Sequence, residues 1–138
     1  MRIFLDTGVF IALFVDKDIY HEKVLEKHTS YSQKRCLFLT STYVLDELYT
    51  RLVYDWGISM VKTKMSKLNK AINDGELRLL DVDKAVFEKA QGVFLKFAEH
   101  KLSFTDATSY VLCRDFEIDE IFTLDRGFKK IGLASSSF

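Results

Sequence analysis

Four short, mainly apolar runs, separated by longer stretches of helical pattern, limit the folds that are open to this chain. The runs are residues 3–5, 36–39, 77–80 and 121–124. Runs of about four residues suit strands that helices cover on both faces, and strands that alternate with helices form parallel sheets. We therefore expect an α/β fold, a three-layer α/β/α sandwich with a mostly parallel central sheet of four to five strands.

Helical patterns fill the intervals between these runs. Apolar residues recur at steps of three and four from Val44 to Trp56, and Gly57 stands where such a helix would end. A second apolar stripe of this period runs between residues 84 and 100. Further helices are expected over residues 9–15, 19–34 and 58–73, and from Ser103 onward. The chain has no proline and only 6 glycines, so few residues interrupt these helices.

Length and charge narrow the class of protein. A chain of 138 residues has the common size of one globular domain, and we expect a single domain over residues 1–134 with a mobile tail at 135–138. The 20 basic and 20 acidic side chains cancel, so no global field attracts nucleic acid or a membrane surface. Cys36 and Cys113 lack a metal-binding spacing. We therefore expect a cytoplasmic protein with free thiols and no membrane span.

Two aspartates stand directly after apolar runs. Asp6 follows the run 3–5, and Asp125 follows the run 121–124. If these runs are neighbouring parallel strands, the two carboxylates meet outside the carboxyl ends of the strands, where ligands bind in such folds. The simpler interpretation is that each is a helix N-cap or a turn residue, and for either one alone the two interpretations carry equal weight.

Two further acids give a weaker signal. Asp106 stands three residues after Ser103, as in a capping box, and this spacing favours a structural role. A helix that begins at the same edge of the sheet would nevertheless deliver a third carboxylate there. Glu47 lies away from the centre of the apolar face of its helix, a position that by itself predicts a solvated side chain.

A cluster of these four carboxylates would need cations. Neighbouring carboxylates about 4 Å apart repel each other by about 4 kcal/mol per pair at an effective dielectric of about 20. Hard oxygen ligands select Mg²⁺ or Mn²⁺. Such a site can polarise a phosphodiester, lower the pKa of a bound water and stabilise the leaving oxygen. The chemistry that it supports is metal-assisted phosphoryl transfer.

Two basic stretches accompany these acids. Lysines recur at positions 62, 64, 67 and 70, and Arg126, Lys129 and Lys130 follow Asp125 closely. Runs of this kind usually form a solvated helix face. If they flank the acidic edge, Lys62, Arg126 and Lys129 would hold a phosphate backbone without reading its sequence.

Four segments of the chain resemble the acidic motifs of the PIN-domain ribonuclease family. Their order, their intervals and the length of the chain match that family, and the resemblance is greatest to the VapC-like toxins of prokaryotic toxin–antitoxin pairs. It covers essentially the whole chain, and the two later segments are the more specific. The segments are residues 4–7 (FLDT), 45–48 (LDEL), 102–107 (LSFTDA) and 122–128 (FTLDRGF).

The resemblance implies a role for each matched residue. Asp6 and Asp106 would be the principal ligands of Mg²⁺ or Mn²⁺, with Glu47 and Asp125 completing the catalytic cluster directly or through water. Thr7 and Thr123 would be the hydroxyls that orient these carboxylates. The role of Glu47 rests almost wholly on the resemblance.

The resemblance also implies partners and a fold. Similar proteins form homodimers, cleave RNA and are held inactive by a small antitoxin protein, and their fold is a parallel sheet flanked by helices. The sequence therefore favours a metal-dependent endoribonuclease, the toxin of a toxin–antitoxin pair. Three alternatives stay open: an RNA-processing nuclease that is not a toxin, a non-catalytic module that binds RNA or protein, and another Mg²⁺-binding α/β protein such as a phosphatase or a receiver domain.

Overall fold

Four parallel strands form the centre of the molecule in the computed structural model, which describes residues 1–136. The strands lie in the order β3-β2-β1-β4, and every neighbouring pair is parallel. Phe4 pairs with Leu39 on one side and with Ile121 on the other. The strands are β1 (Arg2–Leu5), β2 (Leu37–Ser41), β3 (Leu77–Leu80) and β4 (Glu120–Phe122).

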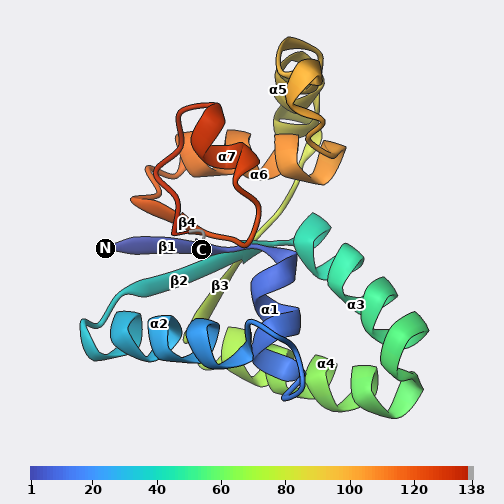
Figure 1. The fold of residues 1–138 in the computed structure, drawn as a ribbon. Helices are drawn as coiled ribbons and strands as arrows, with labels where there is room; N and C mark the ends of the chain where they lie inside the picture. The colour runs from blue at the N-terminus through green and yellow to red at the C-terminus, as the bar shows by residue number, and fades with distance from the viewer. Residues whose placement is uncertain (137–138) are drawn as a thin grey trace.

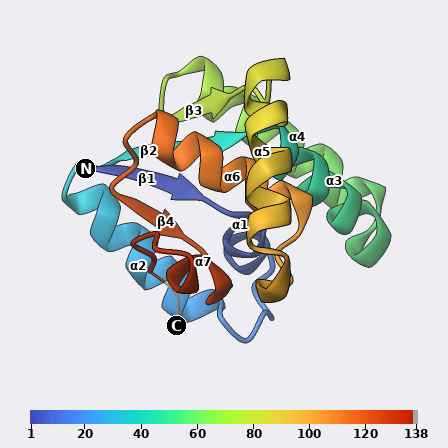
Figure 2. The same ribbon diagram turned by 90° about the horizontal axis from the view of Figure 1, so that it is seen from above.

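Helices cover both faces of this sheet, as Figures 1 and 2 show. One layer holds α1 (Thr7–Phe14), α2 (His21–Gln33) and α4 (Ile58–Asn73). The other holds α5 (Lys84–Lys96), α6 (Phe104–Asp115) and α7 (Gly127–Lys130), with the 3-10 turn η1 (Ala98–His100) between α5 and α6. The helix α3 (Thr42–Trp56) extends from the carboxyl end of β2. The predicted three-layer α/β/α sandwich is confirmed, with four strands in the described residues.

Side-chain caps fix where the helices begin. Asp6, Ser41 and Ser103 each accept a hydrogen bond from a backbone N–H in the first turn of α1, α3 and α6, respectively. Asp83 caps α5 in the same way, by accepting from Val86 N at 2.9 Å. Because β1 and β2 run directly into α1 and α3, the amino ends of those two helices lie at the carboxyl edge of the sheet.

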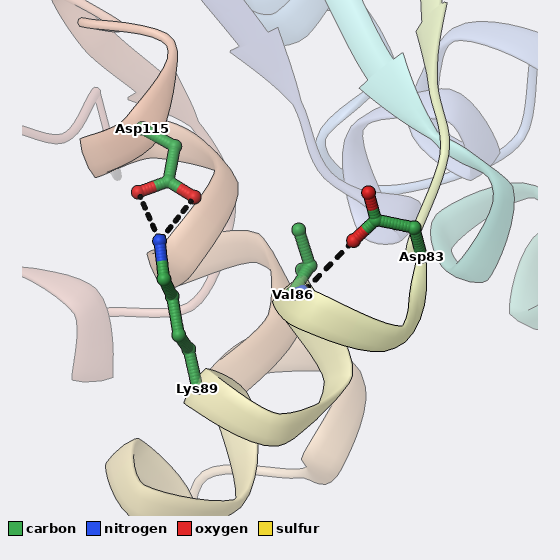
Figure 3. A network of polar contacts seen from close by, with 4 residues as sticks. All are labelled: Asp83, Val86, Lys89 and Asp115. Carbon is green, nitrogen blue, oxygen red and sulfur yellow. Dashed lines mark hydrogen bonds and ion pairs between the residues drawn. The ribbon is translucent and has the colours of Figure 1, made fainter.

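The helices α5 and α6 pack against each other, and a polar contact joins them. Lys89 Nζ lies 3.1 Å from Oδ2 and 3.3 Å from Oδ1 of Asp115, so one ammonium is shared by both carboxylate oxygens (Figure 3). Both side chains are at least one-third exposed, so solvent screens this pair and its contribution to stability is about 0–1 kcal/mol. The packing of apolar residues between the helices is what holds the pair together.

Three elements differ from the sequence-based prediction. The fourth strand ends at Phe122, because Thr123 Oγ1 accepts a hydrogen bond from Asp125 N and turns the chain away from the sheet. The helix expected between residues 84 and 100 ends at Lys96, with η1 occupying its last turn. The helix α7 was not predicted, because four residues are too few for a helical period to be visible.

The last described residues run beside β4. Ile121 N donates to Ala134 O and Ser136 N donates to Ile121 O, both at 3.0 Å. The hydroxyl of Tyr31 donates to Glu120 Oε2 at 2.7 Å and also contacts Ser136 Oγ. Of the expected mobile tail, Ser135 and Ser136 thus lie against the sheet, and residues 137–138 lie outside the described part of the chain.

Most of the buried side chains are apolar. The largest fully buried side chains include Phe4 and Phe122 of neighbouring strands and Phe128 of α7. None of the helices within residues 1–136 has the length and apolar character needed to cross a bilayer.

Candidate active site

Asp6 occupies the junction between β1 and α1. Its backbone N–H donates to Phe122 O at 3.0 Å, which ties the end of β1 to the end of β4. Its side chain is only 7% exposed and accepts two hydrogen bonds, from Thr7 N to Oδ1 at 2.9 Å and from Thr123 Oγ1 to Oδ2 at 2.7 Å. A buried carboxylate held at both oxygens has a fixed orientation.

Thr123 connects the first and the last acid of the site. Its side chain is fully buried, and its hydroxyl both donates to Asp6 Oδ2 and accepts from Asp125 N at 2.9 Å. Asp125 in turn accepts from Gly127 N at 2.7 Å through Oδ1. The turn after β4 is therefore built around the Thr123 hydroxyl and the Asp125 carboxylate.

Glu47 reaches the same place from α3. Thr7 Oγ1 donates to Glu47 Oε2 at 3.2 Å, so the first residue of α1 contacts a carboxylate in the second turn of α3. The periodicity of α3 predicts a solvated Glu47, whereas the structure places it at partial burial against α1. The apolar pattern of one helix does not reveal that another helix begins beside its polar face.

Asp106 is held by the capping box that its spacing predicts. Ser103 N donates to Asp106 Oδ2, and Asp106 N donates to Ser103 Oγ, both at 3.0 Å. The same carboxylate also faces the pocket described next. The structural and the functional interpretation of Asp106 are therefore compatible, because capping uses one carboxylate oxygen and fixes the position of the other.

The four acids line one pocket of about 570 Å³ at the carboxyl edge of the sheet. The carboxylates come from the end of β1, from α3, from α6 and from the turn after β4, so segments distant in sequence meet here. Three cationic side chains share the wall with them. The lining residues are Asp6, Thr7, Gly8, Glu47, Arg51, Lys101, Ser103, Asp106, Leu124, Asp125 and Arg126.

The electrostatics of the pocket disfavour negative charge on its own acids. The pKa of Asp6 is raised to about 7, mainly by burial and then by the Asp106 carboxylate, while the hydrogen bonds from Thr123 and Thr7 act in the opposite direction. Burial also raises the pKa of Asp106, and the Asp125 and Glu47 carboxylates raise it further. These acids thus influence one another and would be stabilised by a cation among them.

The chain matches the PIN domain over residues 3–133 when it is compared with known protein families. It belongs to the PIN domain family. The resemblance noted in the sequence is thereby confirmed, and the parallel four-stranded sheet agrees with it.

The individual proteins that this chain resembles include VapC proteins. The VapC ribonuclease of Archaeoglobus fulgidus is 30% identical over 122 residues, which are 86% of this chain and 74% of that protein. The structure of VapC20 from Mycobacterium tuberculosis, a sarcin–ricin loop cleaving toxin, has a TM-score of 0.84 and 26% identity and covers 99% of both chains. VapBC2 of Rickettsia felis, bound to a DNA fragment from its promoter, has a TM-score of 0.72 over 99% of this chain and 98% of that one; its 15% identity shows a shared fold.

The donor set of this PIN domain suits a hard divalent cation. Every acid in the pocket offers carboxylate oxygens, and no sulfur or imidazole ligand lines it. Within residues 1–136, no three acidic, histidine or cysteine side chains already stand close enough together to hold a metal ion.

Of the three basic residues that were predicted to contact RNA, one lines the pocket. Arg126 lines the pocket, Lys129 lies exposed on α7, and Lys62 lies exposed on α4 and is not part of the pocket wall.

Sequence reasoning did not assign Arg51 and Lys101 to the site. A signal existed for Arg51, which stands one helical turn after Glu47 and so shares its face of α3. No periodic signal marks Lys101, because it lies in an irregular segment between η1 and α6.

Proposed function

We propose that this PIN-domain chain is a metal-dependent endoribonuclease that acts as the toxin of a toxin–antitoxin pair. One observation carries the proposal: Asp6, Glu47, Asp106 and Asp125 line a single pocket in a chain of this family. The VapC ribonuclease that it resembles over most of its length supports RNA as the substrate.

In this proposal, the role of each of the four acids depends on its position in the pocket. Asp6 and Asp106 are the principal ligands of Mg²⁺ or Mn²⁺ in this proposal, because burial and hydrogen bonds fix both carboxylates. Glu47 and Asp125 complete the catalytic cluster from α3 and from the turn after β4. A bound divalent cation supplies positive charge that polarises a phosphodiester and acidifies water.

The surrounding groups hold the acids in place. Thr123 Oγ1 orients Asp6, and Thr7 Oγ1 orients Glu47, so each hydroxyl fixes one carboxylate of the cluster. Ser103 N does the same for Asp106. Arg126 at the pocket and Lys129 on α7 extend a positive surface beyond the cluster for the RNA backbone, and Lys62 on α4 would contact RNA farther away.

Partners and location form part of the same proposal. The structures that share this fold include VapBC2 and VapBC bound to DNA. An antitoxin protein is the expected partner of this chain. A homodimer is the expected assembly. The cytoplasm is the expected location, in keeping with Cys36 and Cys113, which are both free thiols.

Cleavage of a labelled, structured RNA by the purified protein tests the proposal. The wild type, Asp6→Asn and Asp106→Asn are compared in Mg²⁺, Mn²⁺ and EDTA. Asp46→Asn is the matched control, because Asp46 is an exposed acid next to Glu47 that does not line the pocket. We expect cuts that require the metal, vanish in the two pocket variants and persist in the control.

Folding of each variant is checked by circular dichroism. The acidic cluster would lose its assigned role if correctly folded Asp6→Asn and Asp106→Asn proteins cut the RNA as fast as the wild type. Binding without any cleavage by the wild type, equal in Mg²⁺ and EDTA, would instead favour a non-catalytic RNA-binding module.

A further inference from the structure

The acidic pocket is also lined by cationic side chains, and the roles proposed for the four carboxylates do not account for them. Arg51 and Lys101 line the same pocket as Asp6 and Asp106, although they come from different elements. Arg51 lies on α3, and Lys101 lies in the short segment that connects η1 to α6. Both side chains are exposed, so their charges face solvent at the mouth of the pocket.

Arg51 shares a helix face with Glu47. Residues four apart on a helix are neighbours, and a glutamate four residues before an arginine commonly pairs with it. Within residues 1–136, no ion pair or hydrogen bond joins Arg51 to Glu47 or to another carboxylate. The guanidinium therefore keeps its donors available for an anion in the pocket.

Lys101 is held in place by its backbone. Its φ of 55° and ψ of 34° are left-handed, and its N–H donates to Ala98 O at 3.1 Å to close η1. The next residue, Leu102, is only 8% exposed, and the one after it is Ser103, the cap of α6. A non-glycine residue in this conformation is uncommon, and here it places a lysine two residues before the bond that positions Asp106.

A polyanion that enters this pocket meets four acids. Unless cations offset them, the phosphates on either side of the reacting bond are repelled by the carboxylates that the reaction requires. Arginine and lysine at the pocket mouth offset this repulsion and hold the strand without reading its bases.

We propose that Arg51 and Lys101 form a phosphate clamp that holds the backbone of single-stranded RNA at the acidic pocket. Arg51 binds from α3, and Lys101 binds from the segment that precedes the cap of α6. This inference rests on the proposed ribonuclease function and adds to it the residues that contact the substrate. It differs from the sequence-based expectation, in which the basic contacts were Lys62, Arg126 and Lys129.

Binding and cleavage of a fluorescein-labelled single-stranded RNA of mixed sequence test the clamp. Binding is measured by anisotropy in Ca²⁺ at several salt concentrations, with the integrity of the RNA checked on a gel, and cleavage is measured in Mg²⁺ and Mn²⁺. The variants are Arg51→Gln and Lys101→Gln, which remove a charge, and Arg51→Lys, which keeps it. Lys23→Gln, an exposed lysine on α2 away from the pocket, is the matched control.

The clamp predicts a specific pattern. Each charge-removing variant should raise Kd and KM about fivefold and lower the salt slope of log K by about 0.7, with kcat within about twofold of the wild type. Arg51→Lys should restore most of the binding, and Lys23→Gln should match the wild type. A purely structural role would not move the salt slope.

The clamp and the ribonuclease proposal fail in different ways. Wild-type values of Kd, KM and salt slope in both charge-removing variants overturn the clamp and leave the ribonuclease standing. The clamp is also overturned if Lys23→Gln loses as much RNA binding as the pocket variants do. The same holds if the pocket variants lower kcat alone, or if the wild type does not bind the RNA. A wild type that binds through Arg51 and Lys101 but never cuts the RNA contradicts the ribonuclease proposal and leaves the clamp.

Discussion

The Thr123 hydroxyl lies 2.7 Å from Oδ2 of Asp6 and donates a hydrogen bond to it, although the two residues are 117 positions apart. The same hydroxyl accepts from Asp125 N at 2.9 Å. One buried hydroxyl therefore sets the orientation of an acid at the end of β1 and the shape of the turn that carries another acid after β4.

Thr123→Val keeps the shape of the side chain and removes this hydroxyl. Asp6 Oδ2 then loses its donor and Asp125 N loses its acceptor, so we expect unfolding in urea to require about 1–3 kcal/mol less free energy. Misorientation of Asp6 should lower kcat/KM about 10- to 100-fold. Thr123→Ser, which keeps the hydroxyl, should retain most of both properties, and equal losses in Val and Ser would show that the methyl group matters instead.

We expect Asp6 to make the stability of the metal-free protein depend on pH. Its pKa is raised from 3.8 to about 7 in the folded state, so the folded protein holds this proton more tightly than the unfolded chain does. Stability from this group is fully present below about pH 4 and is lost as the pH rises through about 7. In EDTA, we expect Asp6→Asn to exceed the wild type in unfolding free energy by about 1–3 kcal/mol at pH 8. Urea titrations at pH 5 and pH 8 measure this, and a difference that grows on acidification would contradict it.

Divalent cations should reverse this penalty. A ligand that binds only the folded state stabilises it, by about 2.7 kcal/mol at a concentration 100 times its Kd. We expect Mg²⁺ and Mn²⁺ to raise the Tm of the wild type at pH 8, and to raise it much less in Asp106→Asn. Differential scanning fluorimetry with matched Na⁺ ionic strength makes the comparison, and equal shifts in both proteins would place the binding cation elsewhere.

A side chain at Gly127 would crowd two side chains next to the fourth acid. A Cβ at this position would lie 2.9 Å from Leu102 Cδ2 and 3.0 Å from Asp125 Oδ1. We expect Gly127→Ala to displace Asp125, to cost about 1–3 kcal/mol of stability and to lower RNA cleavage.

Gly92→Ala is the natural comparison for Gly127→Ala. Gly92 lies inside α5, and a Cβ there meets no atom within 4 Å. Because alanine favours a helix over glycine, this variant should gain about 0.5–1 kcal/mol and cleave RNA normally. Thermal unfolding and the cleavage assay together separate the two cases, and a tolerated Gly127→Ala would mean that the turn after β4 adjusts easily.

The apolar pattern of the sequence predicts the presence and parallel pairing of the strands better than it predicts which side chains gather around them. Asp6 and Asp125 could be placed at one edge, because each closes an apolar run and the strands are parallel neighbours. The spacing of Asp106 predicts a helix start and favours a capping role, because a capping box and a ligand site use the same residue types at the same spacing. Only the family resemblance assigns Asp106 to the metal site.

Other features depend on contacts between elements. Glu47 is drawn into the site by Thr7, the first residue of a different helix, and no pattern within α3 records that neighbour. Lys101 owes its place to a left-handed backbone after η1, which the sequence marks with no glycine or asparagine. The roles of the four acids and of the two threonines remain predictions that the variants above test.

The segment at residues 134–136 pairs with Ile121 and covers the outer edge of β4. A three-residue strand such as β4 would otherwise leave its outer backbone groups unpaired, and open edges of this kind recruit strands from other chains. Because Ala134 and Ser136 exchange hydrogen bonds with Ile121, that edge is already covered beside the turn that carries Asp125. Only the far edge at β3 is left unpaired within residues 1–136, and there a short strand carrying the exposed Arg78 discourages pairing. Self-association through the β4 edge of the sheet is therefore disfavoured. This edge lies beside the turn that carries Asp125 and the proposed active site.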